Sequence, residues 1–523
     1  MRTATRRWSD AVLVTAFATG LLAPLVDHFV RPASARDTKP EMRAPAPAPA
    51  APKSLDELAK LPRKVDAWYE DHFGLRDVFL RWHNAFKWFA LGTSPTPKLV
   101  LGDDGWVFTT EAMALDDYRG AVPLTPGALE AWRRMLEQRR DWLASRGIEY
   151  MFVVAPYKTQ VYPELLEPRF ESVGPSRTDQ LARHLERTSD FRIVDLRAAV
   201  LAAKEHDTPE DPTFYPYGTH WTDRGAHAGY VELVREIGKR LPGVAPLEDS
   251  AFEVSSVEGG GDSWAGRLYL EGLLPQPNLE WRVREPKARY TGNFREDPVF
   301  VSDREGGEGP RALVFHDSFT LPLRPWLAEH FSRLYCDWTH TPIPERIDAE
   351  KPDLVIQIYN GYTLMQLTPH ALREEDAGAR ARRFGAADQV LWRFDAERFP
   401  DGLSVNQGAK LALDGGVLTL EREAPASLLF LPELDSPEGA DLLVACELES
   451  SEAGKLQVLY CTKRLPRIDR RQYVETLRAA GRERVVLEVP EAHFVGRSAL
   501  WFGPRRGVTK IHSLEVRAAP VRN

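Results

Sequence analysis

Between residues 149 and 360, short strand-like runs alternate with longer helix-like runs, and this alternation limits the possible folds more than any other feature. The helix-like segments include 221–241 and 176–190, where Ser176 is expected to cap the helix. Buried strands that alternate with helices are typical of a doubly wound α/β/α domain with a parallel sheet. The strand-like runs are EYMFVVAP (149–156), FRIVDLR (191–197), ALVFHD (312–317), RLYCDW (333–338) and DLVIQIYN (353–360). The segment from about 242 to 310 is rich in Gly, Pro and Glu and is expected to form loops with small strands.

The pattern changes after about residue 385, where short alternating strands recur at regular intervals, as in GAKLALDGGVLTLERE and DLLVACELES. Such spacing predicts a β-sandwich of the jelly-roll kind. Modules of this kind often bind glycans, although the fold alone does not establish binding. Cys446 and Cys461 fall in two of the runs, and the sequence leaves both a disulfide and buried free thiols open.

The N-terminal segment has the form of an export signal. Arg2, Arg6 and Arg7 precede the apolar run AVLVTAFATGLLAPLV, which predicts an N-terminus in the cytoplasm and an exported remainder. Ala-Ser-Ala at 33–35 resembles a cleavage site, but it lies far beyond the apolar run, so an uncleaved signal anchor is favoured over a removed signal peptide. The Pro- and Ala-rich stretch that follows predicts an extended polyproline II spacer.

A chain of 523 residues exceeds what one hydrophobic core usually organises. We expect a signal anchor or signal peptide at 1–30, a linker at 31–53, a catalytic domain at 54–384 and a β-sandwich, a candidate carbohydrate-binding module, at 385–523. A net charge of −8 does not indicate the basic surface expected of a protein that binds nucleic acid. Because the three cysteines lack metal-ligand spacing and no Gly-rich phosphate loop is present, we expect neither metal nor other cofactor.

Catalytic groups in doubly wound folds gather at the carboxyl ends of the strands. Ser318 is the favoured nucleophile, because a serine at a strand-to-helix turn lies beside free backbone N–H groups that can hold an oxyanion. His220, on an aromatic-rich loop before a helix capped by Thr222, is the favoured base. Five further residues are candidates for substrate or oxyanion contacts, each with a structural role as the alternative: Tyr157, Lys158, Asp317, Asn360 and Trp221.

Several sequence blocks occur together in a fixed order: WYEDHFGLRDVFLRWHNAFK, LGDDGWVF, APYKTQVYPELL, YPYGTHWTDRGA and LVFHDSFTLPLRPWLAEHF. Through them the chain resembles the alginate O-acetyltransferase family of the AlgX and AlgJ kind, within the SGNH-hydrolase-like superfamily. The resemblance covers roughly residues 60 to 365. It implies an SGNH-like fold and a periplasmic Ser-His-Asp triad that moves acetyl onto a polysaccharide hydroxyl.

The resemblance places the nucleophile on Ser318 and the base on His220. The family's aspartate, two residues before the histidine, falls on Gly218, which cannot orient an imidazole. Asp223, Asp211 and a backbone carbonyl are the candidate acceptors for the second N–H of His220, with a role at the helix N-terminus favoured for Asp223. A Ser-His dyad is the alternative.

Two smaller departures accompany the glycine: Tyr157 stands where the family often has Asn, and QIYNGY stands where it commonly has a Glu-Arg pair.

Three functions are consistent with these features. The favoured one is a periplasmic O-acetyltransferase for an exported polysaccharide, held at the bacterial inner membrane by its N-terminal segment. The resemblance implies a membrane-embedded acyltransferase partner that supplies the acetyl group. The alternatives are a carbohydrate esterase or deacetylase, and a catalytically weak glycan-binding scaffold of an export complex.

Overall fold

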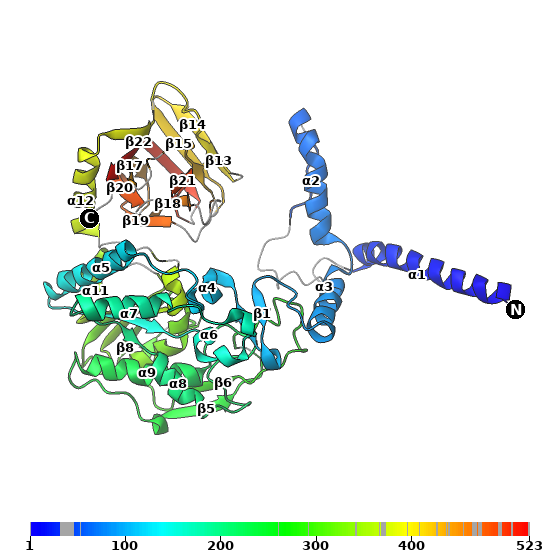
Figure 1. Ribbon diagram of the computed structural model, residues 1–523, viewed down its shortest axis with the longest axis horizontal. Coiled ribbons are helices and arrows are strands. Elements are labelled where there is room, and N and C mark those ends of the chain that lie inside the picture. The colour runs from blue at the N-terminus through cyan, green and yellow to red at the C-terminus, as the bar shows by residue number, and fades with distance from the viewer. Residues whose placement is uncertain are drawn as a thin grey trace.

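The computed structural model of the chain comprises N-terminal helices, an α/β domain and a β-sandwich (Figure 1). The structure describes residues 2–520 except 32–45, 53, 260, 291, 296, 340–341, 366, 368–372, 395, 407, 425–426, 436, 438–439, 453, 463–467, 469–472, 490–493 and 504–505. Most of the expected linker and the Ala-Ser-Ala sequence therefore lie outside the described residues.

A seven-stranded sheet organises the α/β domain, in the order β4-β3-β11-β9-β10-β8-β7. Its first five strands are parallel, which confirms the doubly wound parallel sheet. The remaining two strands, both from the 242–310 segment, add antiparallel at one edge. The strands are β3 (Glu149–Ala155), β4 (Val194–Asp195), β7 (Ala288–Tyr290), β8 (Val299–Arg304), β9 (Arg311–His316), β10 (Arg333–Asp337) and β11 (Leu354–Asn360).

Helices cover both faces of this sheet, and the alternation of side chains along each strand serves both. On β3, Met151 and Val153 pack into one core while Phe152 and Val154 pack into the other. The first core also takes side chains from α8 (Arg197–Lys204), α9 (Asp223–Gly238) and α10 (Arg324–Ala328). The second takes them from α5 (Pro126–Ala144), α7 (Arg177–Thr188) and α11 (Pro344–Glu350). Ser176 caps α7 as expected, because its side chain accepts a hydrogen bond from Asp179 N.

Short elements complete the α/β domain around the carboxyl end of the sheet. They are the hairpins β1 (Leu99–Leu101) with β2 (Val107–Thr109) and β5 (Phe252–Ser256) with β6 (Leu279–Val283), and the helices α4 (Ala114–Tyr118), α6 (Lys158–Val161), η9 (Ser318–Leu323) and η10 (Gly361–Met365).

The C-terminal region is a sandwich of a six-stranded and a five-stranded antiparallel sheet around one apolar core. Cys446 on β17 and Cys461 on β18 lie in different sheets and are buried free thiols, so they form no disulfide. α12 (Arg373–Ala386) precedes the sandwich and packs through Phe384 on its six-stranded sheet. The strands are β12 (Gln389–Arg393), β13 (Ser404–Val405), β14 (Ala409–Asp414), β15 (Val417–Arg422), β16 (Leu429–Phe430), β17 (Ala440–Ser450), β18 (Gly454–Thr462), β19 (Tyr473–Arg478), β20 (Gly481–Val489), β21 (Phe494–Trp501) and β22 (Gly507–Pro520).

The N-terminal helices are α1 (Arg2–Val30), α2 (Leu55–His72) and α3 (Arg76–Ala85), which a π-helical turn, η3 (Phe86–Ala90), extends. Within α1, Asp10–Val30 is long and apolar enough to cross a membrane. In Figure 1, α1 projects away from the α/β domain.

Candidate active site

Ser318 lies at the carboxyl end of β9, in the turn that leads into η9. The neighbouring Asp317 carboxylate accepts hydrogen bonds from the backbone and side-chain N–H groups of Asn360, both at 2.8 Å, and from the Thr363 hydroxyl at 3.0 Å. Its other oxygen accepts from Phe319 N at 3.0 Å. Asp317 and Asn360, both candidates for substrate or oxyanion contacts, join the turn of Ser318 to the end of β11.

His220 reaches Ser318 from the loop before α9. The two atoms His220 Nε2 and Ser318 Oγ are 2.7 Å apart, although the residues are 98 positions apart in the chain. Thr222 caps α9 as expected, and Trp221 is buried, with its indole N–H donating to Phe319 O at 3.0 Å. Trp221 is therefore a buried anchor that fixes the spacing between the two segments.

The second nitrogen of His220 faces Asp262, a residue of the loop between β5 and β6. Asp262 Oδ2 lies 2.7 Å from His220 Nδ1. The same oxygen accepts hydrogen bonds from the backbone N–H groups of Thr219 and His220, the latter at 2.9 Å. Ser318, His220 and Asp262 thus form the hydrogen-bonded series that defines a Ser-His-Asp triad by geometry.

Gly218 makes room for this aspartate. A Cβ atom at position 218 would lie 2.2 Å from the carbonyl oxygen of Asp262 and 2.8 Å from Tyr215 Cβ. The Asp262 backbone is held there because its carbonyl also accepts a hydrogen bond from Gln276 Nε2 at 2.8 Å. The glycine at 218 is therefore required by the close approach of the loop that supplies the carboxylate.

The expectation that Asp223 or Asp211 orients His220 is corrected by this arrangement. Asp223 belongs to the first turn of α9, where its carboxylate accepts from Trp281 N at 3.0 Å and pairs with Arg295 at 3.0 Å. Asp211 pairs with Arg224 at 3.1 Å. Both carboxylates are engaged elsewhere, and Asp262 takes the role expected of them.

Electrostatics at His220 follow from the contact with Asp262. Burial opposes charge on both groups, but their attraction prevails, so the pKa of His220 is raised and the pKa of Asp262 is lowered. Backbone N–H donors add to the stabilisation of the carboxylate. The His220 and Asp262 side chains keep 29% and 26% of their surface exposed, so solvent reaches the pair.

Comparison with known proteins shows what the same domain is similar to. Residues 99–268 match the SGNH hydrolase-like domain of the acetyltransferase AlgX. A curated relative, "Probable alginate O-acetylase AlgJ" of Pseudomonas syringae pv. tomato, is 26% identical over 242 residues, which cover 44% of this chain and 57% of the relative. The matching residues thus span little more than half of that relative. This part of the chain is therefore similar to the AlgX and AlgJ acetyltransferases.

Solved structures of the family are also similar. The O-acetyltransferase domain of Pseudomonas putida AlgJ is 20% identical with a TM-score of 0.35, and covers 51% of this chain and 92% of its own. Pseudomonas aeruginosa AlgX is 13% identical with a TM-score of 0.36, and covers 82% of this chain and 96% of its own.

Two of the candidates for substrate or oxyanion contacts, Lys158 and Tyr157, are packed inside the domain near the triad. The buried Lys158 Nζ donates to the carbonyls of Val107 at 2.8 Å, Pro216 at 3.1 Å and Gly218. Burial lowers the pKa of Lys158 to about 7, yet three acceptors match the three N–H bonds of the ammonium form. Lys158 therefore supports the loop that carries Gly218 and His220.

Tyr157 is buried, and its hydroxyl donates to Asp117 Oδ2 at 2.7 Å. Burial raises the pKa of this hydroxyl, and Asp117 raises it further. Tyr157 thus anchors α4 against the start of α6.

We expect Lys158→Met to destabilise the protein by about 3 kcal/mol, because the change leaves buried carbonyl groups without a donor. Urea unfolding followed by tryptophan fluorescence measures the effect. The surface variant Lys239→Met should lie within about 0.5 kcal/mol of the wild type. Equal stability of Lys158→Met and Lys239→Met would contradict the supporting role.

Asp262 is the functional residue that sequence reasoning missed. It lies 42 residues beyond His220 in a loop without hydrophobic periodicity, so neither spacing nor an element boundary marks it. The available signal was Gly218 itself, since a glycine in place of a side chain leaves space for another segment. Among the described residues, no group of three or more His, Cys, Asp and Glu side chains is arranged to hold a metal ion.

Proposed function

We propose that the protein is an O-acetyltransferase that transfers acetyl to hydroxyl groups of an exported polysaccharide through an acetyl-Ser318 intermediate. The observation that carries the proposal is the hydrogen-bonded series from Ser318 Oγ through His220 to Asp262. The match of residues 99–268 to the acetyltransferase domain of AlgX supports the reaction class.

In the first half-reaction, His220 Nε2 accepts the hydroxyl proton while Ser318 Oγ attacks the carbonyl carbon of an acetyl donor. The backbone N–H of Ser318 stabilises the resulting oxyanion, since those of Asp317, Phe319 and Thr320 donate to other groups of the protein. The tetrahedral intermediate collapses, the bond to the donor breaks, and the imidazolium returns its proton to the leaving group. The products are acetyl-Ser318 and the protonated donor without its acetyl group.

In the second half-reaction, His220 accepts the proton of a sugar hydroxyl, whose oxygen attacks the acetyl carbon. The Ser318 ester bond breaks and the serine recovers its proton from the imidazolium. Asp262 stabilises the imidazolium in both halves and holds Nδ1–H in place, so that Nε2 is the nitrogen that exchanges protons.

The N-terminal helix supports a location at the membrane. α1 contains one apolar span, and basic residues precede it. We infer that α1 is an uncleaved anchor in the bacterial inner membrane, that the remainder is periplasmic, and that a membrane-embedded acyltransferase supplies the acetyl group.

An acetyl adduct on Ser318 is the expected result when the purified chain is mixed with 4-nitrophenyl acetate and digested for mass spectrometry. Added oligosaccharide should discharge the adduct and appear as its acetyl ester. Ser318→Ala should carry no adduct at this position, His220→Ala should acquire it far more slowly, and the surface control Ser172→Ala should behave as the wild type.

Two outcomes would contradict the proposal, and each would favour a different function. An adduct that is discharged only to water, with every oligosaccharide tested, identifies an esterase. The complete lack of an adduct in the wild type contradicts the acetyl-Ser318 intermediate and favours the catalytically weak scaffold.

A further inference from the structure

One face of α3 and η3 is apolar and uncovered. Val78, Phe79, Trp82, Phe86 and Phe89 recur at helical spacing and fall within an arc of roughly 100°. We call these five residues the α3 face. Their exposed fractions run from 36% to 72%, with Trp82 the most exposed. Large apolar side chains grouped on one helix face mark a surface that another apolar medium covers.

The opposite side of the same helix is fixed to the catalytic domain. Trp88 is buried in a cluster with Leu99 and Trp264, and Asn84 Nδ2 donates to Leu268 O at 2.7 Å. The helix therefore cannot turn to bury the α3 face against its own domain without breaking these contacts.

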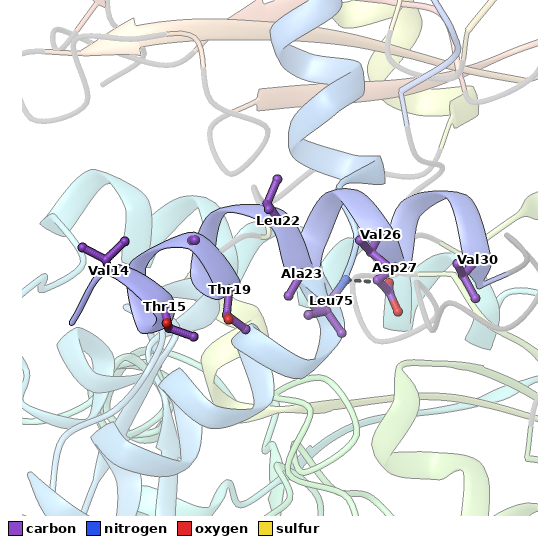
Figure 2. A pocket seen from close by; sticks show the side chains of 10 residues that line it. Val14, Thr15, Thr19, Leu22, Ala23, Val26, Asp27, Val30 and Leu75 are labelled. Carbon is purple, nitrogen blue, oxygen red and sulfur yellow. Dashed lines mark hydrogen bonds between the residues drawn. The ribbon is translucent and has the colours of Figure 1, made fainter. Parts of the chain in front are cut away.

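α1 is joined to the start of α3 by short polar contacts. Arg31 donates two hydrogen bonds to Asp77, at 2.9 and 2.7 Å, and Asp27 Oδ2 accepts from Leu75 N at 2.8 Å. A Cβ atom at Gly74 would lie 2.0 Å from Pro24 O, so the two helices meet with their backbones in close approach. Figure 2 shows Leu75 against α1 beside Ala23 and Val26, with the bond to Asp27 dashed.

These contacts set the direction of α3 relative to α1. In Figure 1, α2 and α3 run across the direction in which α1 projects. When α1 crosses a bilayer, α3 consequently lies along the membrane surface at the point where α1 leaves it. Arg81 and Lys87 border the α3 face on its two sides, as expected for a helix at an anionic lipid interface.

We propose that the α3 face lies in the interfacial layer of the bilayer that α1 spans, with Arg81 and Lys87 directed toward anionic lipid headgroups. The proposal rests on the proposed anchoring by α1. Trp and Phe side chains are favoured at this depth, where their rings meet both acyl chains and headgroups. The catalytic domain is then held against the membrane by a second contact besides α1.

Fluorescent labels on the full chain in phosphatidylglycerol-containing vesicles test the proposal. Cys336, Cys446 and Cys461 are buried, so bimane attaches selectively to an introduced exposed cysteine. Trp82→Cys and Phe86→Cys report on the α3 face. Leu21→Cys in α1 gives the lipid reference, and Val173→Cys, 69% exposed on the α/β domain, gives the water reference.

We expect lipid-borne nitroxide to quench the Trp82→Cys and Phe86→Cys labels several-fold more than the Val173→Cys label, and iodide to quench them less. Arg81→Glu with Lys87→Glu should reduce the lipid quenching at Phe86→Cys. Labels at 82 and 86 that match Val173→Cys overturn the proposal. Shielding from both quenchers also overturns it, because it shows that protein covers the face.

A Leu21→Cys label without lipid quenching shows that the anchoring itself is wrong, and overturns the membrane placement of the α3 face with it. Acetylation of Ser318 by a soluble ester, measured on the same samples, separates either failure from a failure of the proposed reaction.

Discussion

Asp262→Asn is expected to lower the rate of acetyl transfer by about 10⁴-fold, the loss seen when the aspartate of a serine-protease triad becomes asparagine. The amide keeps the size of the side chain but removes the charge that stabilises the imidazolium, and it favours the tautomer with the proton on the wrong nitrogen. Release of 4-nitrophenol in a single turnover measures the step. Asp211→Asn removes a carboxylate from an ion pair near the same loop and should leave the rate unchanged.

Asp262→Asn should also change how the rate of acetyl transfer depends on pH. His220 acts as a base only when neutral, so the rate falls as the pH falls through its pKa, which Asp262 raises. Without that charge the imidazolium is less stable, its pKa is lower, and the residual activity persists to lower pH. A rate within about tenfold of the wild type, with an unshifted acid limb, would show that Asp262 is dispensable.

Gly218→Asp restores the residue expected from the family and should nevertheless destroy activity. Its Cβ would lie 2.2 Å from the Asp262 carbonyl oxygen, so the loop that carries the working carboxylate must move away. We expect destabilisation of about 3 kcal/mol and a loss of transfer at least as large as for Asp262→Asn. Thermal unfolding and the single-turnover assay measure the two effects.

Two companion variants identify the cause. The double variant Gly218→Asp with Asp262→Gly should not recover, because the collision is with the backbone at 262 and not with its side chain. Gly266→Ala, in the same loop but with open space around the added Cβ, should resemble the wild type. Recovery in the double variant would show that a carboxylate works equally well from either position.

The elements predicted correctly from the sequence are those that local residue patterns determine. The parallel strands are continuous apolar runs, and Ser318 and His220 each lie at the boundary of a predicted element. The antiparallel addition of β7 and β8 depends on pairing with distant strands, which no local pattern records. Asp262 was not predicted for the same reason. Its contact with His220 depends on the packing of its loop against Gly218, which no local pattern records.

Asp223 and Asp211 are candidates for orienting His220 because they lie near it in the chain. Asp223 lies three residues away, yet it serves Trp281 and Arg295. Closeness along the chain is a weak guide here, since the direction of a side chain is set by the helix that holds it.

The segment that supplies Asp262 also holds α3 and η3, since Asn84 donates to Leu268 O and Trp88 shares a buried apolar cluster with Trp264. Trp264 in turn donates to the Thr219 hydroxyl, beside His220, at 3.1 Å. The segment from Asp262 to Leu268 therefore holds both α3 and the loop of His220 in place. A change that loosens this segment would alter the orientation of the α/β domain relative to α3. The same change would move Asp262 away from His220.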